Sequence, residues 1–234
     1  ENQDNMGEFV ECVQGIGEAA KFLNFPIVSG NVSFYNQTKD EGIKPTPSIG
    51  GVGLIKDYRK MITMDFKEID NIVLVIGKTE GHIDQSLFAR NILDEKNGPP
   101  PEINLFNEKN NGETLLKLIE NNLIKSAHDI SLGGIITAVT KMCIKGNKGI
   151  KIQKPKYLIN EIEYLFAEDQ GRYIVEINKK DLKKVTDIFN KNAVHFDELG
   201  SIIEKELFIN NKTKVTIDEL RTCNTSWLKD YMSK

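Results

Sequence analysis

One apolar run constrains the fold of this chain more than any other stretch. Residues 71–77 read Asn-Ile-Val-Leu-Val-Ile-Gly, an unbroken series of apolar and mostly β-branched side chains. Successive side chains of a strand point to opposite faces of a sheet, so both faces of this strand must be covered. The run therefore predicts a central strand inside a fold that mixes α and β. We place a domain boundary just before this run, which predicts one domain over residues 1–67 and a second over residues 68–234.

Composition excludes several classes of function. A length of 234 residues fits one large or two small domains, and 39% hydrophobic residues are enough for a core. A net charge of −3 argues against nucleic acid as a partner, and the lysines at 179, 180, 183 and 184 fit a solvated helix face. No apolar run approaches the roughly 18 residues that cross a bilayer, and no signal peptide is visible. We therefore expect a cytoplasmic protein with no membrane partner.

The cysteines indicate a reducing compartment. Cys12, Cys143 and Cys223 lie far apart and form no Cys-x-x-Cys pair. Cys12 and Cys143 each lie among apolar residues on helical patterns, which predicts buried structural thiols rather than nucleophiles.

Patterns before the central run predict one helix and two strands. Apolar residues at three-four spacing predict a helix over residues 6–23. Short apolar runs predict strands at 25–29 and 49–55, the second of them unusually rich in glycine. Residues 60–66 fit a short edge strand or a turn.

Patterns after the run predict an alternation of helices and strands. Helices are expected at residues 83–93, 112–123, 134–144, 159–165, 181–190 and 218–231. Strands are expected at residues 150–153, 172–177, 194–203 and 207–209, and residues 126–134 fit a short strand, a small-residue turn and the start of the next helix.

A first candidate site follows the strand predicted at 25–29. Gly30 allows close approach of the backbone to a bulky or charged group, and Asn31 offers a hard oxygen suited to Mg²⁺. Ser33 offers a hydroxyl on the same side of an extended chain as Asn31. The alternative is a tight turn capped by Asn and Ser without a ligand, and residue types alone favour that alternative.

A second candidate site is the turn at residues 129–134. Its glycines resemble those of strand-to-helix turns that hold anions, although the lysine of a P-loop is missing. Asp129 could cap the helix or bind a metal, with capping the more common use. His128 could act as a general base, but a packed histidine with one satisfied nitrogen is the more common case.

An acidic pair, Glu168 and Asp169, comes next to Arg172. Neighbours in an extended chain point to opposite faces, so the two carboxylates are not expected to act as a paired acid and base. An ion pair between Glu168 and Arg172 is the structural alternative to a functional role.

Several blocks together resemble one enzyme family. They are Phe9–Glu11, Gly15–Ala19, Pro26–Asn36, Pro45–Ile55, Gln85–Leu87, His128–Ser131, Leu165–Tyr173 and the tail around Trp227. The chain is similar over nearly its whole length to the phosphoribosylformylglycinamidine synthases, in particular to the ATP-dependent synthetase chain that works with a separate glutaminase. The later blocks are shared with a wider superfamily that includes aminoimidazole ribonucleotide synthetase.

The resemblance implies both a fold and a reaction. Residues 1–67 would be the C-terminal part of the second ferredoxin-like α+β domain, and residues 68–234 a complete C-terminal α/β domain of the aminoimidazole ribonucleotide synthetase type. The family uses ATP and Mg²⁺ to convert formylglycinamide ribonucleotide and glutamine-derived ammonia into formylglycinamidine ribonucleotide, ADP and phosphate. Its partners would be a glutaminase subunit and a small accessory subunit.

The resemblance also implies site residues. By position, Gly30 would contact ATP, Asn31 would bind Mg²⁺ and Ser33 would contact the substrate. The family's catalytic histidine lies in a half of the enzyme with no counterpart here, so no catalytic residue is expected in this chain. Leu132 stands where the family usually has Asp, which puts a ligand role of the 129–134 turn in doubt.

Two alternatives compete with a catalytic role. The chain could be a non-catalytic scaffold with vestigial nucleotide contacts, or another superfamily member such as selenophosphate synthetase. The second would need a reactive cysteine near the start, whereas Cys12 lies on an apolar helix face. Because the chain begins with Glu1 rather than Met, we expect a piece of a longer protein. An unpaired sheet edge in its first domain predicts a homodimer or a poorly behaved monomer.

Overall fold

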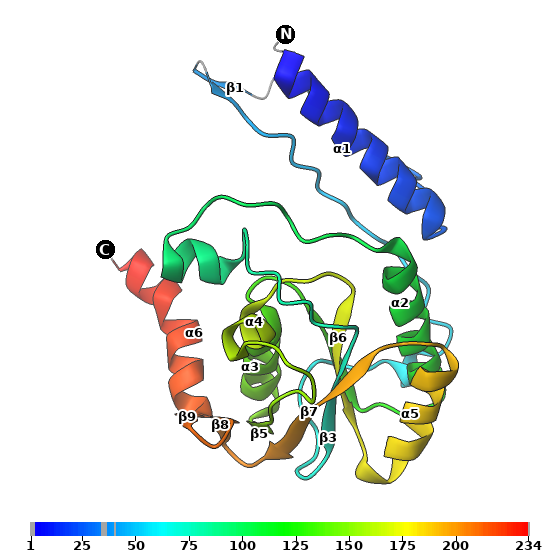
Figure 1. The fold of residues 1–234 in the computed structure, drawn as a ribbon, viewed down its shortest axis with the longest axis vertical. Helices are drawn as coiled ribbons and strands as arrows, with labels where there is room; N and C mark the ends of the chain where they lie inside the picture. Colours follow the sequence, from blue (N-terminus) through cyan, green and yellow to red (C-terminus); the bar gives the residue numbers. More distant parts are fainter. Residues whose placement is uncertain (1–2, 34–36, 40, 234) are drawn as a thin grey trace. The chain divides into compact units, whose positions relative to one another are not determined.

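The computed structural model describes residues 3–33, 37–39 and 41–233. The chain forms two compact units, Glu1–Lys56 and Asp57–Lys234, and each is described by itself (Figure 1).

The first unit is built around one helix. Helix α1 (Gln3–Phe22) confirms the helix predicted at residues 6–23, and none of its residues is fully buried. Strands β1 (Gln37–Thr38) and β2 (Glu41–Gly42) pair as a short antiparallel hairpin. The remaining described residues of this unit are extended or irregular.

Both strands predicted in the first unit are wrong. Residues 25–29 and 49–55 are extended, but no described residue pairs with either segment in a β-ladder. Val28, Val52 and Leu54 are 90%, 96% and 90% exposed, so the apolar side chains that suggested strands are uncovered. A strand needs neighbours that satisfy its backbone groups and cover its side chains, and the described residues of this unit supply neither.

The second unit contains a seven-stranded sheet with the order β4-β6-β3-β7-β5-β8-β9. All neighbouring pairs are antiparallel except β5 and β8, which are parallel. The strands are β3 (Ile72–Ile76), β4 (Ser126–Ile130), β5 (Gly149–Ile152), β6 (Arg172–Ile177), β7 (Phe196–Ile203), β8 (Glu206–Ile209) and β9 (Thr213–Thr216).

Helices cover both faces of this sheet, as the central run predicts. Val73 and Val75 of β3 pack into a core beneath α3 (Gly134–Gly146), α4 (Glu161–Phe166) and α6 (Ile217–Met232). Leu74 and Ile76 point the other way, into a core beneath α2 (Leu105–Glu120) and α5 (Leu182–Lys191). Figure 1 shows the two groups of helices on opposite sides of the sheet. The prediction of a mixed α and β fold is confirmed.

Some boundaries differ from the predicted ones for local reasons. Helix α2 begins at Leu105 rather than 112, because the Asn104 side chain accepts the Asn107 N–H and caps the helix. The helix expected over 83–93 is reduced to a π-helical segment, η2 (Ala89–Leu93). Two short 3₁₀ turns, η1 (Tyr58–Lys60) and η3 (Lys179–Asp181), complete the elements.

A buried carboxylate ties the segment before β3 to the sheet. Glu176 of β6 is fully buried and accepts hydrogen bonds from the backbone N–H groups of Lys67 and Glu68 at 2.8 and 3.0 Å. It also accepts from Asn71 Nδ2 at 2.7 Å and from Ser126 Oγ at 2.9 Å. Four donors from two other segments therefore converge on one side chain.

Candidate functional site

The three residues of the first candidate site lie in the first unit, after α1. Gly30, Asn31 and Ser33 are exposed in an extended segment. A Cβ placed on Gly30 would meet no atom of a described residue within 4 Å, which leaves room there for a ligand. Residues 34–36 of the same stretch lie outside the described residues. The ATP, Mg²⁺ and substrate roles of the three residues stay predictions.

The second candidate site lies at one end of the sheet in the second unit. The strand pairings bring the C-terminal ends of β3 and β4 and the start of β6 to this end. Three segments follow or precede these strands there: residues 77–82, 131–134 and 165–171. We call them together the polar end of the sheet. The sequence singled out parts of two of these segments separately, and the structure brings them into contact.

The glycine turn packs directly against residues 165–167. Gly133 and Gly134 have φ values of +82° and +69°, and α3 begins at Gly134. A Cβ on Gly134 would lie 2.7 Å from the carbonyl oxygens of Leu165 and Ala167. The turn therefore needs glycine at this position both for backbone conformation and for close approach of another segment.

Glu168 caps helix α3 from a distant segment. Its Oε1 accepts the N–H of Gly133 at 2.7 Å and the N–H of Leu87 at 2.8 Å. The helix N-terminus carries partial positive charge, which favours a carboxylate as it favours a phosphate. Glu168 thus occupies one N–H of the glycine turn, that of Gly133, which an external anion would otherwise bind. Asp129 does not cap α3, so that expectation is wrong.

Asp169 and Arg172 hold the rest of the polar end together. The Asp169 carboxylate accepts the N–H groups of Glu80, Gly81 and His82 at 3.0 to 3.1 Å. The buried guanidinium of Arg172 lies 3.9 Å from this carboxylate, which corrects the expected pairing with Glu168. Arg172 also donates to the Asp169 and Ala167 carbonyls and to Thr79 Oγ1. The adjacent carboxylates of Glu168 and Asp169 therefore bind separate sets of N–H groups.

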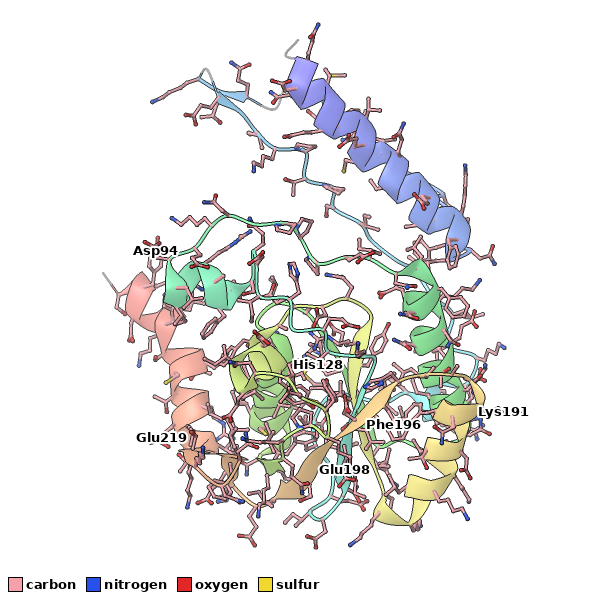
Figure 2. All side chains as sticks on the ribbon, viewed as in Figure 1. Asp94, His128, Lys191, Phe196, Glu198 and Glu219 are labelled. Carbon is pink, nitrogen blue, oxygen red and sulfur yellow. The ribbon has the colours of Figure 1, made fainter. Side chains whose placement is uncertain are left out.

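His128, labelled in Figure 2, forms a pair with Asp129 at the end of β4. His128 Nδ1 lies 2.9 Å from Asp129 Oδ1, and the histidine side chain is nearly buried while the aspartate is exposed. Partial burial raises the pKa of the Asp129 carboxyl, but the bond and charge of His128 outweigh it and lower the pKa overall. Nε2 of His128 has no partner among the described residues. The predicted packed histidine with one satisfied nitrogen is confirmed.

The described residues contain no group of three or more His, Cys, Asp or Glu side chains that could hold a metal ion. Cys143 is fully buried in the core under α3, and burial raises the pKa of its thiol to about 12. A thiol of this kind stays protonated at neutral pH and is a poor nucleophile, as the sequence predicts. Cys12 is only half-buried, so the prediction of a buried thiol there is wrong, and Cys223 is exposed. No helix among the described residues is long and apolar enough to span a membrane.

Sequence reasoning missed the two carboxylates that organise the second unit. It treated Glu168 as a partner of Arg172, and it gave no role to Glu176. The available signal was weak: Glu176 stands between Val175 and Ile177 in a strand that is otherwise apolar at this end. A lone acid at a buried strand position requires several hydrogen-bond donors around it.

Two family descriptions match the chain. Residues 68–210 match the C-terminal domain of AIR synthase related proteins, and residues 1–55 match the N-terminal domain of the same group. These matches confirm the predicted combination of an N-terminal-type domain followed by a C-terminal-type α/β domain.

Curated relatives are similar over the whole of this chain. The phosphoribosylformylglycinamidine synthase subunit PurL of Pelagibacter ubique is 72% identical over 232 residues, which are 99% of this chain and 32% of the relative. The subunit of the same name from Bartonella henselae is 39% identical over 234 residues, which are 100% of this chain and 32% of the relative. The chain thus spans about a third of the length of the curated relatives it matches. The identity to these relatives confirms the family resemblance seen in the sequence.

Solved structures share the fold at low identity. T. maritima PurL complexed with ATP has a TM-score of 0.54 at 18% identity, covering 70% of this chain and 27% of that chain. T. maritima PurL complexed with FGAR has a TM-score of 0.59 at 19% identity, covering 70% of this chain and 30% of that chain.

Proposed function

The chain belongs to the family of AIR synthase related proteins, and from this premise we propose that it is the C-terminal part of an ATP-dependent ligase of purine synthesis. The complete ligase converts formylglycinamide ribonucleotide, glutamine-derived ammonia and ATP into formylglycinamidine ribonucleotide, ADP and phosphate. The observation that carries this proposal is the 72% identity to the Pelagibacter ubique PurL subunit over 232 residues. The ATP and FGAR complexes of T. maritima PurL add support from a more distant relative.

The active site of the complete enzyme would be built from this chain and from parts of the enzyme outside it. The segment after α1 would supply one wall of that site. The open space over Gly30 suits a phosphate or another bulky group close to the backbone. Asn31 supplies one uncharged oxygen, whereas Mg²⁺ is octahedral and takes about six ligands. The other ligands must come from ATP, water and parts of the enzyme outside this chain. A Mg²⁺ ion held there would supply positive charge next to the phosphate that is transferred.

The chain's own contribution is to position these groups. Gly30 leaves room for the nucleotide, Asn31 fixes the metal on one side, and the Ser33 hydroxyl orients the substrate. The residues that act on the reacting atoms lie elsewhere in the complete enzyme. The isolated chain is therefore expected to be inactive.

Replacing Asn31 by Ala in the complete enzyme is expected to lower kcat/KM about hundredfold and to raise the Mg²⁺ concentration needed for half-maximal activity. Loss of one metal ligand weakens stabilisation of charge in the transition state, and a hundredfold loss corresponds to about 2.7 kcal/mol. Initial rates of ADP formation with ammonia as the nitrogen donor, measured across a Mg²⁺ series, provide the test.

Gln37→Ala is the matched control, because Gln37 is an exposed amide of the same unit that bonds only the Lys39 carbonyl among described residues. It should leave both the rate and the Mg²⁺ dependence unchanged. An Asn31→Ala enzyme with normal activity and normal Mg²⁺ dependence would remove Asn31 from the site.

A scaffold role is the second candidate, and the cap on α3 favours it for the second unit. Glu168 already fills the anion position at the glycine turn. In this alternative the chain stabilises the enzyme and its nucleotide contacts are vestigial. Calorimetry of the chain with ATP and Mg²⁺ separates the two candidates, since tight stoichiometric binding rules out a pure scaffold.

Domains, partners and location follow from the same proposal. We place the domain boundary between residues 67 and 68. The complete enzyme is expected in the cytoplasm, where it would bind a glutaminase subunit and a small accessory subunit. The uncovered side chains of Val28, Val52 and Leu54 support an expected homodimer of the isolated chain, because exposed apolar stretches favour association. A monomeric mass by light scattering across a wide concentration range would contradict the homodimer.

A further inference from the structure

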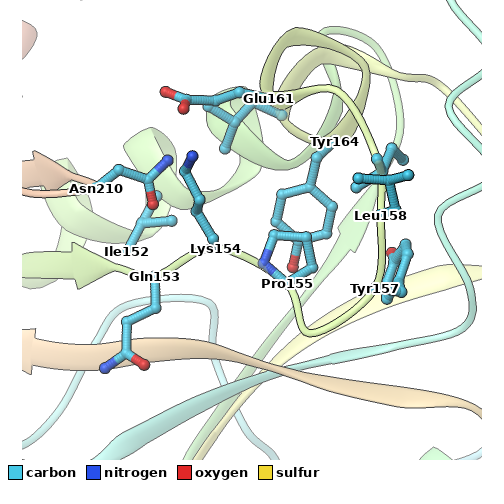
Figure 3. Close-up of a pocket in the computed structure, with 11 residues that line it drawn as sticks. Ile152, Gln153, Lys154, Pro155, Tyr157, Leu158, Glu161, Tyr164 and Asn210 are labelled. Carbon is cyan, nitrogen blue, oxygen red and sulfur yellow. The ribbon is translucent and has the colours of Figure 1, made fainter.

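A small cavity opens between the C-terminal end of β5 and helix α4. Its volume is about 180 Å³, and Figure 3 shows the residues around it. Ile152, Pro155 and Leu165 give it apolar walls. The volume exceeds what one water molecule needs, yet it is smaller than the roughly 300–1,000 Å³ of sites for drug-sized ligands. The cavity therefore fits a small metabolite.

Two residues that line the cavity carry polar atoms without partners. The Tyr164 hydroxyl and Asn210 Oδ1 are buried and have no hydrogen-bond partner among the described residues. Burial, reinforced by the nearby Asp197, raises the pKa of Tyr164, so its hydroxyl keeps its proton and can donate. The neighbouring Tyr157 hydroxyl, in contrast, donates to the Thr79 carbonyl. Unsatisfied buried polar groups are costly, and here they occur as one donor and one acceptor around one cavity.

The cavity also carries one charge of each sign. Lys154 comes from the loop after β5, and Glu161 comes from the first turn of α4. Figure 3 shows the Lys154 side chain extending toward Asn210 and Glu161. Neither charge forms a salt bridge or a side-chain hydrogen bond with another described residue. Both side chains are exposed to solvent, so the two charges are free to bind a ligand at the cavity.

We propose that this cavity binds a small zwitterion, an α-amino acid, independently of the ligase reaction. The ammonium group would bind Glu161 and Asn210 Oδ1, and the carboxylate would bind Lys154. A side chain would pack against Ile152 and Leu165 and reach toward the Tyr164 hydroxyl. Both charges and both unpaired atoms would then have partners, which neither a simple anion nor a simple cation provides.

The test is equilibrium binding of the twenty protein amino acids, each measured separately with the 234-residue chain by NMR titration. At least one should bind with a Kd below about 1 mM, while its N-acetyl derivative and its amine lacking the carboxylate should bind at least about tenfold more weakly. Lys154→Gln and Glu161→Gln should each weaken binding about tenfold as well. Asn210→Gly should also weaken it, and glycine preserves the backbone there because Asn210 has φ +48°.

Matched controls come from the same two segments. Lys156→Gln and Glu163→Gln change exposed charges of the same type that do not line the cavity, and they should leave the affinity unchanged. Absence of binding by every amino acid would overturn the proposal. So would equal binding of the N-acetyl derivative, or binding that Lys154→Gln and Glu161→Gln leave intact.

Discussion

Replacing Glu176 by Ala is expected to lower the free energy of unfolding by about 4 to 6 kcal/mol. The substitution removes the acceptor of four hydrogen bonds, from the Lys67 and Glu68 backbone, Asn71 and Ser126. Each donor left unpaired in the interior costs about 1–3 kcal/mol, and some of them will recover water. Such a loss is a large share of the about 5–15 kcal/mol that stabilises a typical domain. Urea unfolding followed by circular dichroism provides the measurement.

Glu198→Ala is the matched control for this prediction. Glu198 lies on β7 of the same sheet, but its side chain is exposed, so its removal should change stability by no more than about 0.5 kcal/mol. If Glu176→Ala were as mild as Glu198→Ala, the four hydrogen bonds would not stabilise the native state as described.

Replacing Gly134 by Ala is the second large effect, with an expected loss of about 3 kcal/mol or more. The left-handed backbone at φ +69° strains any residue with a Cβ, at about 1–2 kcal/mol. The added Cβ would also lie 2.7 Å from the Leu165 and Ala167 carbonyl oxygens, and overpacking of this kind costs about 1–3 kcal/mol. These contacts are backbone atoms, so no flexible side chain can move aside. Thermal and urea unfolding of the variant provide the measurement.

Gly112→Ala tests the same substitution without strain. Gly112 lies inside α2, and an added Cβ would make only an ordinary contact with the Tyr173 hydroxyl at 3.6 Å. Alanine in a helix interior should stabilise the chain by about 0.5–1 kcal/mol. Equal and small effects at both positions would show that the turn and residues 165–167 can separate at little cost.

Much of the second unit could be predicted because its pattern is local. The run at β3 has side chains that alternate between two cores, and this arrangement follows from the period of a strand alone. Strand β9 was missed because Thr213–Thr216 is polar and largely exposed, and its pairing with β8 depends on a neighbour rather than on its own pattern. Helix α2 begins at Leu105 because Asn104 caps it there, whereas the apolar periodicity that predicts the helix begins several residues later in the sequence.

The first unit shows the opposite case. Its two runs contain the apolar residues of strands, although the second is rich in glycine, and a strand forms only where another backbone completes the ladder. The candidate sites, like the strands, depend on contacts with distant segments that the local sequence does not specify. Residue types and a family resemblance could nominate Gly30, Asn31 and Ser33, and they could nominate the glycine turn. They could not reveal that Glu168, which lies 35 residues after Gly133, fills the helix end at that turn.

The cap on α3 also has a thermodynamic consequence for any phosphate that approaches the glycine turn. The phosphate competes with Glu168 for the Gly133 N–H and must displace the carboxylate, which also accepts the Leu87 N–H. Two charge-assisted bonds hold the carboxylate, so the uncapped fraction of molecules is on the order of 1%. The apparent affinity of the turn for an external anion is reduced by that fraction, about hundredfold. The helix end thus behaves as a site under permanent intramolecular inhibition.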